Sequence, residues 1–407
     1  MGFLSLLSST LFLSLALGAP QAQTDSTKKD PPPNTGTGGE VKLAANLERD
    51  KQTIQEFGKK VTEDPKGIVK SWSGPDPCKY VGFKCDKTPK GYNAIAALDF
   101  NGYQLGGPDL EITGLLDKLV DLAIFHANSN KFVKSIPEQL GQIPYLYELD
   151  VSNNQLSGPF PKGVLTATKL TFLDLRFNQF EGSVPSDVFH MDLDVLFLNN
   201  NKFTGSIPSD LGASPALYIT LANNQFDGSL PSELNNMKKL KEILFLGNKF
   251  SGSLPTELGG MVETTVFDVS ANQLSGSVPE SLCNLPKMEL LTLAKNQFSD
   301  SLPTNMGGMK ALDTFDASDN KLSGTVPESL CSLPKVKHIK LMNNDFHEDL
   351  GPACLEALKK KVLDVSGNCI KNAPNQKPGC SGGDQNTDRT RLSQPNGQGT
   401  QGTNPST

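Results

Sequence analysis

Residues that could carry out chemistry are sparse in this chain of 407 residues. Its four histidines, His126, His190, His338 and His347, are far apart in sequence, so we expect no shared metal site or proton relay. No G-x-S-x-G nucleophile motif is present. Acid pairs on neighbouring strands could imitate a glycosidase dyad, but nothing in the sequence marks an acid with a raised pKa. The sequence therefore predicts no enzyme, no metal site and no cofactor.

Cysteine is the other reactive residue type, with seven copies. Together with an apolar leader they indicate an oxidising compartment and structural disulfides. Two pairs flank the ends of the central region, and a third pair occupies nearly equivalent places in successive repeats, which stack about 4.8 Å apart. The expected bridges are Cys78 with Cys85, Cys331 with Cys354 and Cys369 with Cys380.

Cys283 is the unpaired cysteine of the seven. It occupies the place of Cys331 two repeats earlier, roughly 10 Å away by the same stacking distance, which is too far for a bridge. Two interpretations remain open. One is a buried, inert thiol, and the other is a reactive thiol that forms a disulfide-linked dimer.

An internal repeat must position these residues. Asparagines recur 24 residues apart, with two gaps of 23, within the frame L-x-L-x-x-N-x-[LF]-x-G-x-[IVL]-P. This frame is the leucine-rich repeat signature. The recurring asparagines are Asn130, Asn154, Asn178, Asn201, Asn224, Asn248, Asn272, Asn296, Asn320, Asn344 and Asn368.

Each letter of the frame has a physical role. The residues five and three before each asparagine point inward from a short strand, and their neighbours face outward. The asparagine amide is expected to bond backbone groups of adjacent coils and form a ladder. The fold class is therefore an α/β solenoid, a right-handed superhelix of plant-type leucine-rich repeats with a concave parallel β-sheet.

The rest of the chain is divided by composition. We expect a signal peptide at residues 1–18, a disordered linker at 19–40, an N-terminal helical and disulfide cap at 41–95, repeats at 96–353, a C-terminal cap at 354–380 and a disordered tail at 381–407. No second apolar stretch reaches the roughly 20 residues of a membrane span. The mature protein is thus expected to be secreted, without a membrane span.

The outward positions of the strands are expected to form the binding surface. Acids outnumber basic residues there, and they account for most of the net charge of −6, so a basic partner is favoured. Neighbouring strands add aromatic residues of the kind enriched in binding hot spots. The predicted ligand-binding residues are Tyr147, Glu148, Asp150, Phe172, Asp174, Arg176, Phe177, Phe197, Tyr218 and Asp268. A solvated acidic face and aromatic packing beneath a loop are the structural alternatives.

Several motifs resemble a known family. The segment from Pro77 to Cys85, the two Pro-Glu-Ser-Leu-Cys steps ending at Cys283 and Cys331, and the segment from Asn368 to Cys380 look like the repeat domain of leucine-rich repeat extensins. The resemblance implies a cell-wall protein that binds basic secreted peptides of the rapid alkalinisation factor type. No Ser-Pro-Pro-Pro repeats follow Cys380, so the resemblance does not extend to an extensin module.

Other functions remain open at this point. Polygalacturonase-inhibiting proteins are similar in repeat type and size, which makes an inhibitor of a secreted wall-degrading enzyme the main alternative. A receptor ectodomain is a third candidate. Basic runs are short, so nucleic-acid binding is not expected.

Overall fold

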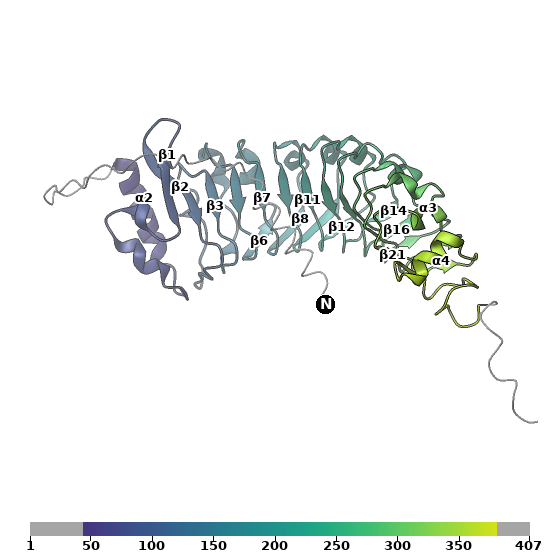
Figure 1. Ribbon diagram of the computed structural model, residues 1–407. Helices are drawn as coiled ribbons and strands as arrows, with labels where there is room; N and C mark the ends of the chain where they lie inside the picture. Colours follow the sequence, from purple (N-terminus) through teal and green to yellow (C-terminus); the bar gives the residue numbers. More distant parts are fainter. Residues whose placement is uncertain (1–43, 381–407) are drawn as a thin grey trace, which may run out of the picture. The chain divides into compact units, whose positions relative to one another are not determined.

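The computed structural model describes residues 44–380, which lie within one compact unit (Figure 1). The predicted signal peptide, the linker, the first three residues of the predicted N-terminal cap and the C-terminal tail lie outside the described residues. Within the described unit the chain winds as a leucine-rich repeat solenoid, and each coil contributes one strand to a long parallel sheet. The predicted fold class is confirmed.

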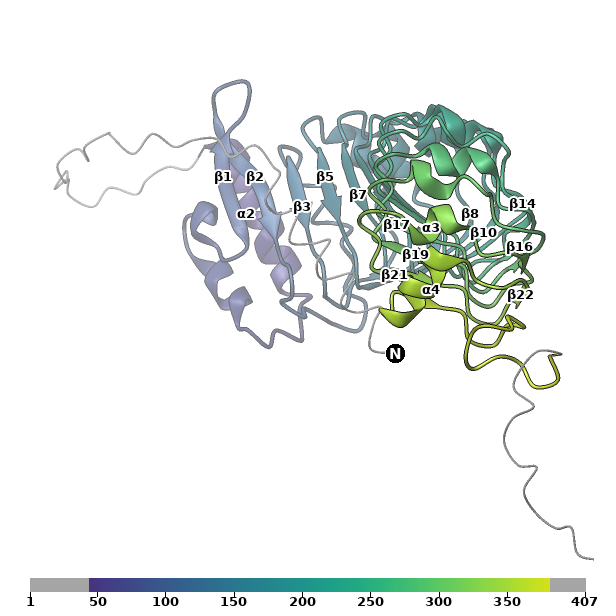
Figure 2. The same cartoon turned by 45° about the vertical axis from the view of Figure 1, so that its right-hand side comes forward.

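The inner sheet has 13 strands, each paired with the strand of the next coil (Figure 2). All pairs are parallel except the first, β1 with β2, which is an antiparallel hairpin that the repeat frame did not predict. The strands are β1 Phe83–Lys87, β2 Asn93–Asp99, β3 Ile124–His126, β5 Glu148–Asp150, β7 Phe172–Asp174, β9 Val195–Phe197, β11 Tyr218–Thr220, β13 Glu242–Leu244, β15 Val266–Asp268, β17 Leu290–Thr292, β19 Thr314–Asp316, β21 His338–Lys340 and β23 Leu363–Asp364.

The opposite side of the solenoid carries three smaller parallel sheets. Their strands follow the repeat asparagines, where the Gly of each frame takes positive φ, as at Gly205 (φ 83°). The strands are β4 Val133–Lys134, β6 Gln155–Pro159, β8 Gln179–Ser183, β10 Lys202–Ser206, β12 Gln225–Asp227, β14 Ser251–Ser253, β16 Gln273–Gly276, β18 Gln297–Phe298, β20 Ser323–Gly324 and β22 Asp345–Phe346.

Short helices complete most coils, and all of them except η9 begin directly after the Pro of the frame, whose fixed φ suits a helix start. Most are single 3-10 turns. They are η3 Glu138–Gln142, η4 Lys162–Thr166, η5 Ser186–His190, η6 Ser209–Ala213, η7 Ser232–Asn236, η8 Glu280–Asn284, η9 Met306–Gly308 and the α-helical turn α3 Glu328–Cys331.

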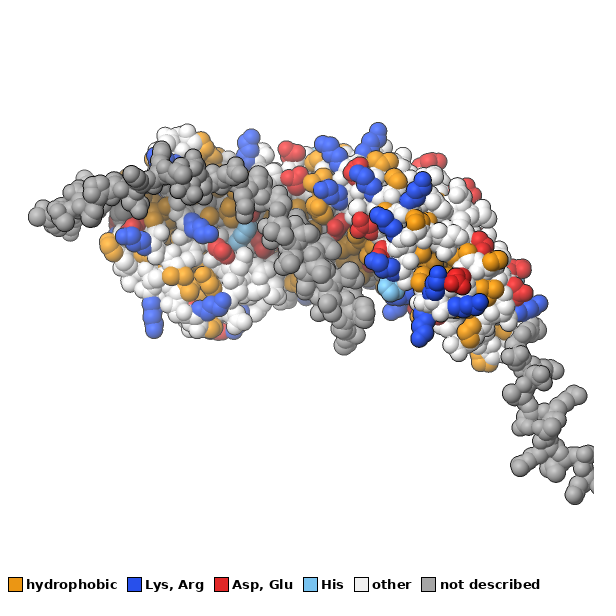
Figure 3. Space-filling view, viewed as in Figure 1, with side chains coloured by type: hydrophobic (Ala, Val, Ile, Leu, Met, Phe, Trp, Pro, Cys, Tyr) orange, Lys and Arg blue, Asp and Glu red, His pale blue; other side chains and the backbone are white. Residues whose placement is uncertain are grey.

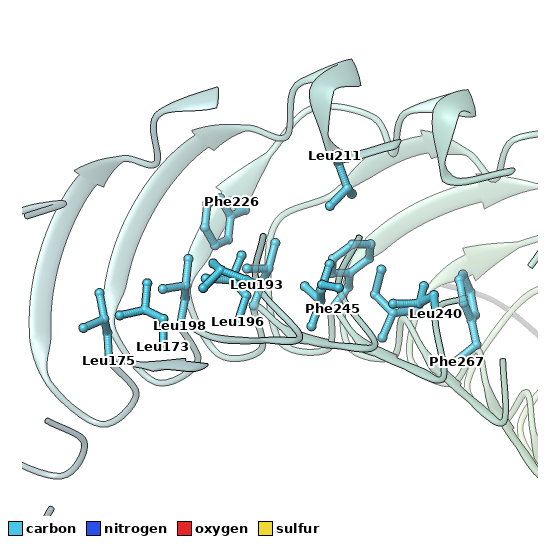
Figure 4. Close-up of a cluster of buried hydrophobic side chains, with 14 of the residues drawn as sticks. Leu173, Leu175, Leu193, Leu196, Leu198, Leu211, Phe226, Leu240, Phe245 and Phe267 are labelled. Carbon is cyan, nitrogen blue, oxygen red and sulfur yellow. The ribbon is translucent and has the colours of Figure 1, made fainter. Parts of the chain in front are cut away.

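The core runs between the two sides of the solenoid as one continuous apolar cluster. Figure 4 shows leucines of successive inner strands, such as Leu173 and Leu196, pointing toward the interior. Beneath the outer strands, Phe180, Phe203, Phe226 and Phe250 stack with ring centroids 6.2 or 6.3 Å apart. Because every coil buries its apolar face only against its neighbours, stability is shared along the solenoid.

The predicted asparagine ladder is present. The Nδ2 group of Asn178 donates to the carbonyl of Val151 in the preceding coil (2.9 Å) and to that of Leu175 in its own turn (3.1 Å). Its Oδ1 accepts the N–H of Leu156 at 3.0 Å. The same pattern recurs from Asn130 to Asn368. Buried amides thus satisfy backbone groups that would otherwise lack partners.

The N-terminal end is covered by a helix and an aromatic cluster. Helix α2 (Ala45–Gly58) buries Leu47, Ile54 and Phe57 against the first coil. It is followed by the turns η1 Ile68–Ser73 and η2 Pro77–Lys79. Trp72 stacks on Phe100 at 5.4 Å between centroids. This cap removes the first apolar coil from water.

At the C-terminal end, helix α4 (Pro352–Lys359) packs on α3 and β23. The structure contains three disulfides, Cys78–Cys85, Cys331–Cys354 and Cys369–Cys380, which are the pairs that the sequence predicts. The Cα atoms of Cys331 and Cys354 lie 5.0 Å apart, as the stacking of successive coils requires.

Cys283 is free and 3% exposed, within η8. Burial, with a smaller contribution from the nearby Glu280 carboxylate, raises the pKa of its thiol to about 11. A buried neutral thiol neither reaches another molecule nor attacks one. The structure therefore contradicts the disulfide-linked dimer through Cys283 and favours the inert thiol.

Candidate ligand-binding face

The candidate site is the solvent side of the inner sheet, across β5, β7, β9, β11, β13 and β15. We call this surface the inner face. Parallel pairing aligns equivalent residues of successive coils, so Glu148, Phe172 and Val195 form one row, and Asp150, Asp174 and Phe197 form the next. The ten predicted ligand-binding residues all lie on these strands or beside them. Their exposure differs greatly.

Aromatic side chains at both ends of the strands are open to solvent. Tyr147, just before β5, is 39% exposed, and Phe177, beyond β7, is 50% exposed. Phe172 and Tyr218 are half-buried on β7 and β11. Large exposed aromatics cost free energy in water and are used as anchors at interfaces. These four side chains give the inner face apolar surface to which a ligand can bind.

Phe197 was predicted to point outward as an anchor for a ligand. That prediction is wrong, because the residue is only 7% exposed. Its ring lies edge-on to Phe172, with centroids 6.1 Å apart, and the Arg176 guanidinium lies 5.2 Å from its centroid. The aromatic ring and the guanidinium cover each other, which is a favourable cation–π arrangement. Phe197 therefore supports the inner face from beneath rather than presenting itself to a ligand.

Asp174 was predicted to be an acid that faces solvent. That prediction is also wrong, because its side chain is fully buried. Its carboxylate lies 2.8 Å from Nε of Arg176 and accepts the backbone N–H of the same residue at 3.1 Å. Burial, reinforced by the neighbouring Asp150, raises the pKa of Asp174, while Arg176 opposes the shift. The role of Asp174 is to hold Arg176 in place over Phe197.

Two further predicted acids bind their own turns. Asp150 accepts the N–H of Ser152 at 2.9 Å and its hydroxyl at 2.6 Å. Asp268 accepts the N–H of Ser270 at 2.8 Å, and burial raises the pKa of its carboxyl against that hydrogen bond. A side chain that bonds the backbone two residues on stabilises a turn. Sequence counting treated these carboxylates as free for a ligand, whereas each already has a partner.

Glu148 is paired as well, with His126 of the preceding coil, at 2.8 Å from Oε2 to Nε2. Burial lowers the pKa of His126, but the hydrogen bond with Glu148 and the charge of Asp150 outweigh it and raise the pKa overall. The His126 ring in turn lies 6.5 Å from that of Phe172. One continuous cluster therefore joins Glu148, His126, Phe172, Phe197, Arg176 and Asp174, and we call it the paired cluster.

Glu242 is an acid of the inner face that is not among the ten predicted ligand-binding residues. It is half-buried on β13, between Tyr218 of β11 and Val266 of β15. Burial and the nearby Glu289 carboxylate raise the pKa of Glu242 to about 7, against a smaller opposing effect of Lys241. The signal that could have identified it is the apolar character of the outward positions around it, Leu244, Val266 and Leu290.

Charge is distributed unevenly along the solenoid. Figure 3 shows basic side chains gathered over the C-terminal coils, around β21 and α4. Two of them are neutralised across coils, Lys337 by Asp313 at 2.5 Å and Lys340 by Asp316 at 3.4 Å. These two ion pairs reduce the uncompensated positive charge of the C-terminal coils.

Within residues 44–380, no helix has the length and apolar character needed to cross a membrane. The same residues contain no group of three or more His, Cys, Asp or Glu side chains placed to hold a metal ion.

Two family models match the chain. The leucine rich repeat N-terminal domain matches residues 47–86, the helical and disulfide cap. The leucine rich repeat itself matches residues 145–165, 169–191, 192–214, 264–285 and 311–333. On the inner face, strands β5, β7, β9 and β15 lie within these matched repeats.

Among known proteins, leucine-rich repeat extensin-like protein 1 of Arabidopsis thaliana is 35% identical over 149 residues, which is 36% of this chain and 20% of that protein. The chain therefore spans about a fifth of the length of this relative. The resemblance to leucine-rich repeat extensins is confirmed over that part.

Solved structures show the same fold. The structure of PEPR1 with AtPEP1 has a TM-score of 0.58 and 25% identity, covering 80% of this chain and 52% of that chain. The ectodomain of the Arabidopsis receptor kinase HAESA, in complex with an IDA peptide hormone ligand, has a TM-score of 0.54 and 25% identity, covering 80% and 66%. The chain thus resembles plant receptor ectodomains.

Proposed function

We propose that this leucine-rich repeat protein is a secreted, non-catalytic binding protein of the cell wall, and that its inner face binds a basic peptide or protein. The observation that carries the proposal is a set of aromatic side chains that are open to solvent or half-buried on the coils of β5, β7 and β11, namely Tyr147, Phe172, Phe177 and Tyr218. Exposed aromatic side chains gathered on one face mark a surface suited to a partner.

The paired cluster supports this function by rigidity. His126 and Glu148, and Arg176 and Asp174, hold each other in fixed positions next to the aromatic side chains. A surface whose side chains are already ordered loses less conformational entropy when a ligand binds. The buried part of the prediction, Asp174 and Phe197, thus contributes to binding by positioning Arg176 and Phe172.

A basic ligand is favoured by the carboxylates that remain without a side-chain partner. On the described inner face, Asp194 and Glu242 have no hydrogen bond or ion pair to their side chains. They lie on the coils of β9 and β13, on either side of Tyr218 of β11. Their combined negative potential attracts a cationic partner and accelerates its association.

The similar proteins agree with this class of ligand. The structure of PEPR1 includes AtPEP1, and the HAESA ectodomain structure is a complex with an IDA peptide hormone ligand, so a protein of similar fold binds a peptide. The extensin-like relative points to the cell wall. A peptide of the rapid alkalinisation factor type is our specific candidate.

A binding panel tests the proposal. The purified chain is titrated with basic cysteine-rich peptides and with a secreted polygalacturonase, at low and high salt. We expect a peptide to bind with an affinity that falls as salt rises, because exposed charges are screened. Binding of polygalacturonase alone would instead identify an enzyme inhibitor, and binding of neither would contradict the proposal.

A further inference from the structure

Glu242 stands out among the acids of the inner face because its carboxylate is half-buried and has no partner within the described chain, whereas Asp194, which also lacks one, is exposed. Asp150, Asp268 and Asp316 accept hydrogen bonds from serines two residues further on. Asp174 and Glu148 face Arg176 and His126. No hydrogen bond or ion pair to the Glu242 side chain exists among residues 44–380, so only the more distant charge of Lys241 acts in its favour.

The surroundings of Glu242 are mostly apolar. The strand register places it in one row with Tyr218, Val266 and Leu290. Leu244 follows two residues later on the same side of β13. These side chains reduce the access of water to the carboxylate, and burial is accordingly the main cause of the raised pKa.

The nearest basic residue does not neutralise Glu242. Lys241 directs its ammonium group toward the Tyr218 ring, at 5.7 Å from the centroid, and forms no ion pair with the carboxylate. The other charged or titratable groups of the neighbouring strands are Asp268 on β15 and Glu289 before β17, and both are acids. Glu289 therefore adds repulsion to the cost of burial.

We propose that Glu242 and its apolar row form an anchoring site for a guanidinium or ammonium group of the ligand, whose aliphatic stem packs on Val266, Leu290 and Leu244. The inference rests on the proposed function, because it assigns one contact of the same ligand. An unpaired, half-buried carboxylate gains more from a cation than a solvated one does, because the cation offsets desolvation already incurred on folding.

A proton is linked to this contact. Near neutral pH part of the population of Glu242 is protonated, and the arriving cation favours the carboxylate form, so binding releases a proton to solvent. Affinity for a cationic group therefore rises with pH between about 5 and 8.

The direct test uses propylguanidinium chloride, a guanidinium with a short aliphatic stem, and the full chain labelled with ¹³C at glutamate side chains. The pKa of Glu242 is measured by NMR with rising probe concentration, and sodium chloride of equal ionic strength is the control. The resonance of the Glu242 side chain is assigned as the one that is missing from the spectrum of the Glu242→Gln variant. We expect a saturable fall of about one pKa unit or more with the probe. An equal effect of both salts would overturn the inference.

A second arm separates this inference from the proposed function. With a basic peptide from the binding panel, Glu242→Gln is expected to weaken affinity about tenfold or more at pH 8, whereas Glu289→Gln, an exposed acid nearby, changes it less than about threefold. A peptide that binds both variants equally well would leave the proposed function standing and refute the Glu242 anchor. Absence of any peptide binding would refute the proposed function, while the probe titration still decides the site.

Discussion

The paired cluster around β7 and the apolar row around Glu242 are parts of one sheet with the same backbone geometry, yet their acids behave differently. In the paired cluster, Asp174 is fully buried and faces Arg176 at 2.8 Å. In the row on β13, Glu242 is half-buried and faces only apolar groups and another acid. The repeat frame places both on outward positions, so the frame alone does not distinguish a supporting acid from a binding acid.

The difference lies in the neighbouring coils. Asp174 has an arginine two residues on and an aromatic ring, Phe197, in the same row of the next coil. Glu242 has leucine at the equivalent distance and valine in the next coil. Because the acid of the first region is paired within the chain, that region stabilises the fold. The second region instead keeps a desolvated charge available for a ligand.

The largest effect is expected where the paired cluster is truncated. Phe197→Ala removes a buried ring and uncovers Arg176, and we predict a loss of about 3 to 5 kcal/mol in the free energy of unfolding. Phe177→Ala, which removes an exposed ring of the same size from the adjoining coil, should change it by less than about 0.5 kcal/mol. Denaturant unfolding of both variants measures the contrast, and equal losses would show that the two rings are equally buried.

The second effect concerns the buried ion pair. Asp174→Ala leaves the Arg176 guanidinium, which is mostly buried, without its carboxylate, and we predict a loss of about 2 to 4 kcal/mol. Asp194→Ala, the control on the next coil, removes an exposed acid and should be close to neutral. If Asp174→Ala were as stable as the unmodified chain, the pairing with Arg176 would not stabilise the inner face.

A smaller effect, dependent on pH, is expected at Glu242. Because its folded pKa of about 7 lies above the ordinary value of 4.5, the folded state binds the proton more tightly. Its contribution to stability is complete below pH 4.5 and is lost as pH rises through 7. Glu242→Gln should therefore stabilise the chain by about 1 kcal/mol at pH 8, after allowance for partial solvation, and by nothing at pH 4. Thermal unfolding across this range measures the difference, and a stabilisation independent of pH would contradict the assignment.

Much of the fold could be predicted from the sequence, because the repeat frame states which residues are buried. The asparagine ladder and the inner strands follow from the spacing of Asn178 and its equivalents, since a period of two within each strand fixes the inward side. The β1–β2 hairpin could not be predicted, because it lies before the regular frame begins and its pairing depends on contacts with the cap.

The candidate site could be predicted only in part. Tyr147 and Phe177 are exposed as outward positions should be. Phe197 and Asp174 are not, because long neighbouring side chains, above all Arg176, fold over the strand and cover them. The exposure of a side chain on a sheet face depends on its neighbours in adjacent coils. The repeat frame describes each coil separately, so it does not predict such pairs.

The central claim is that the aromatic side chains of the inner face bind the ligand, and the affinity of a Tyr147→Ala/Phe177→Ala double variant for a peptide from the binding panel tests it most directly. Val262→Ala is the control, because Val262 is 41% exposed but precedes β15 outside the inner face. We predict that the double variant binds at least about tenfold more weakly with unchanged stability, since hot-spot aromatics contribute about 1 kcal/mol or more each. Affinity equal to that of the Val262 control would contradict the claim.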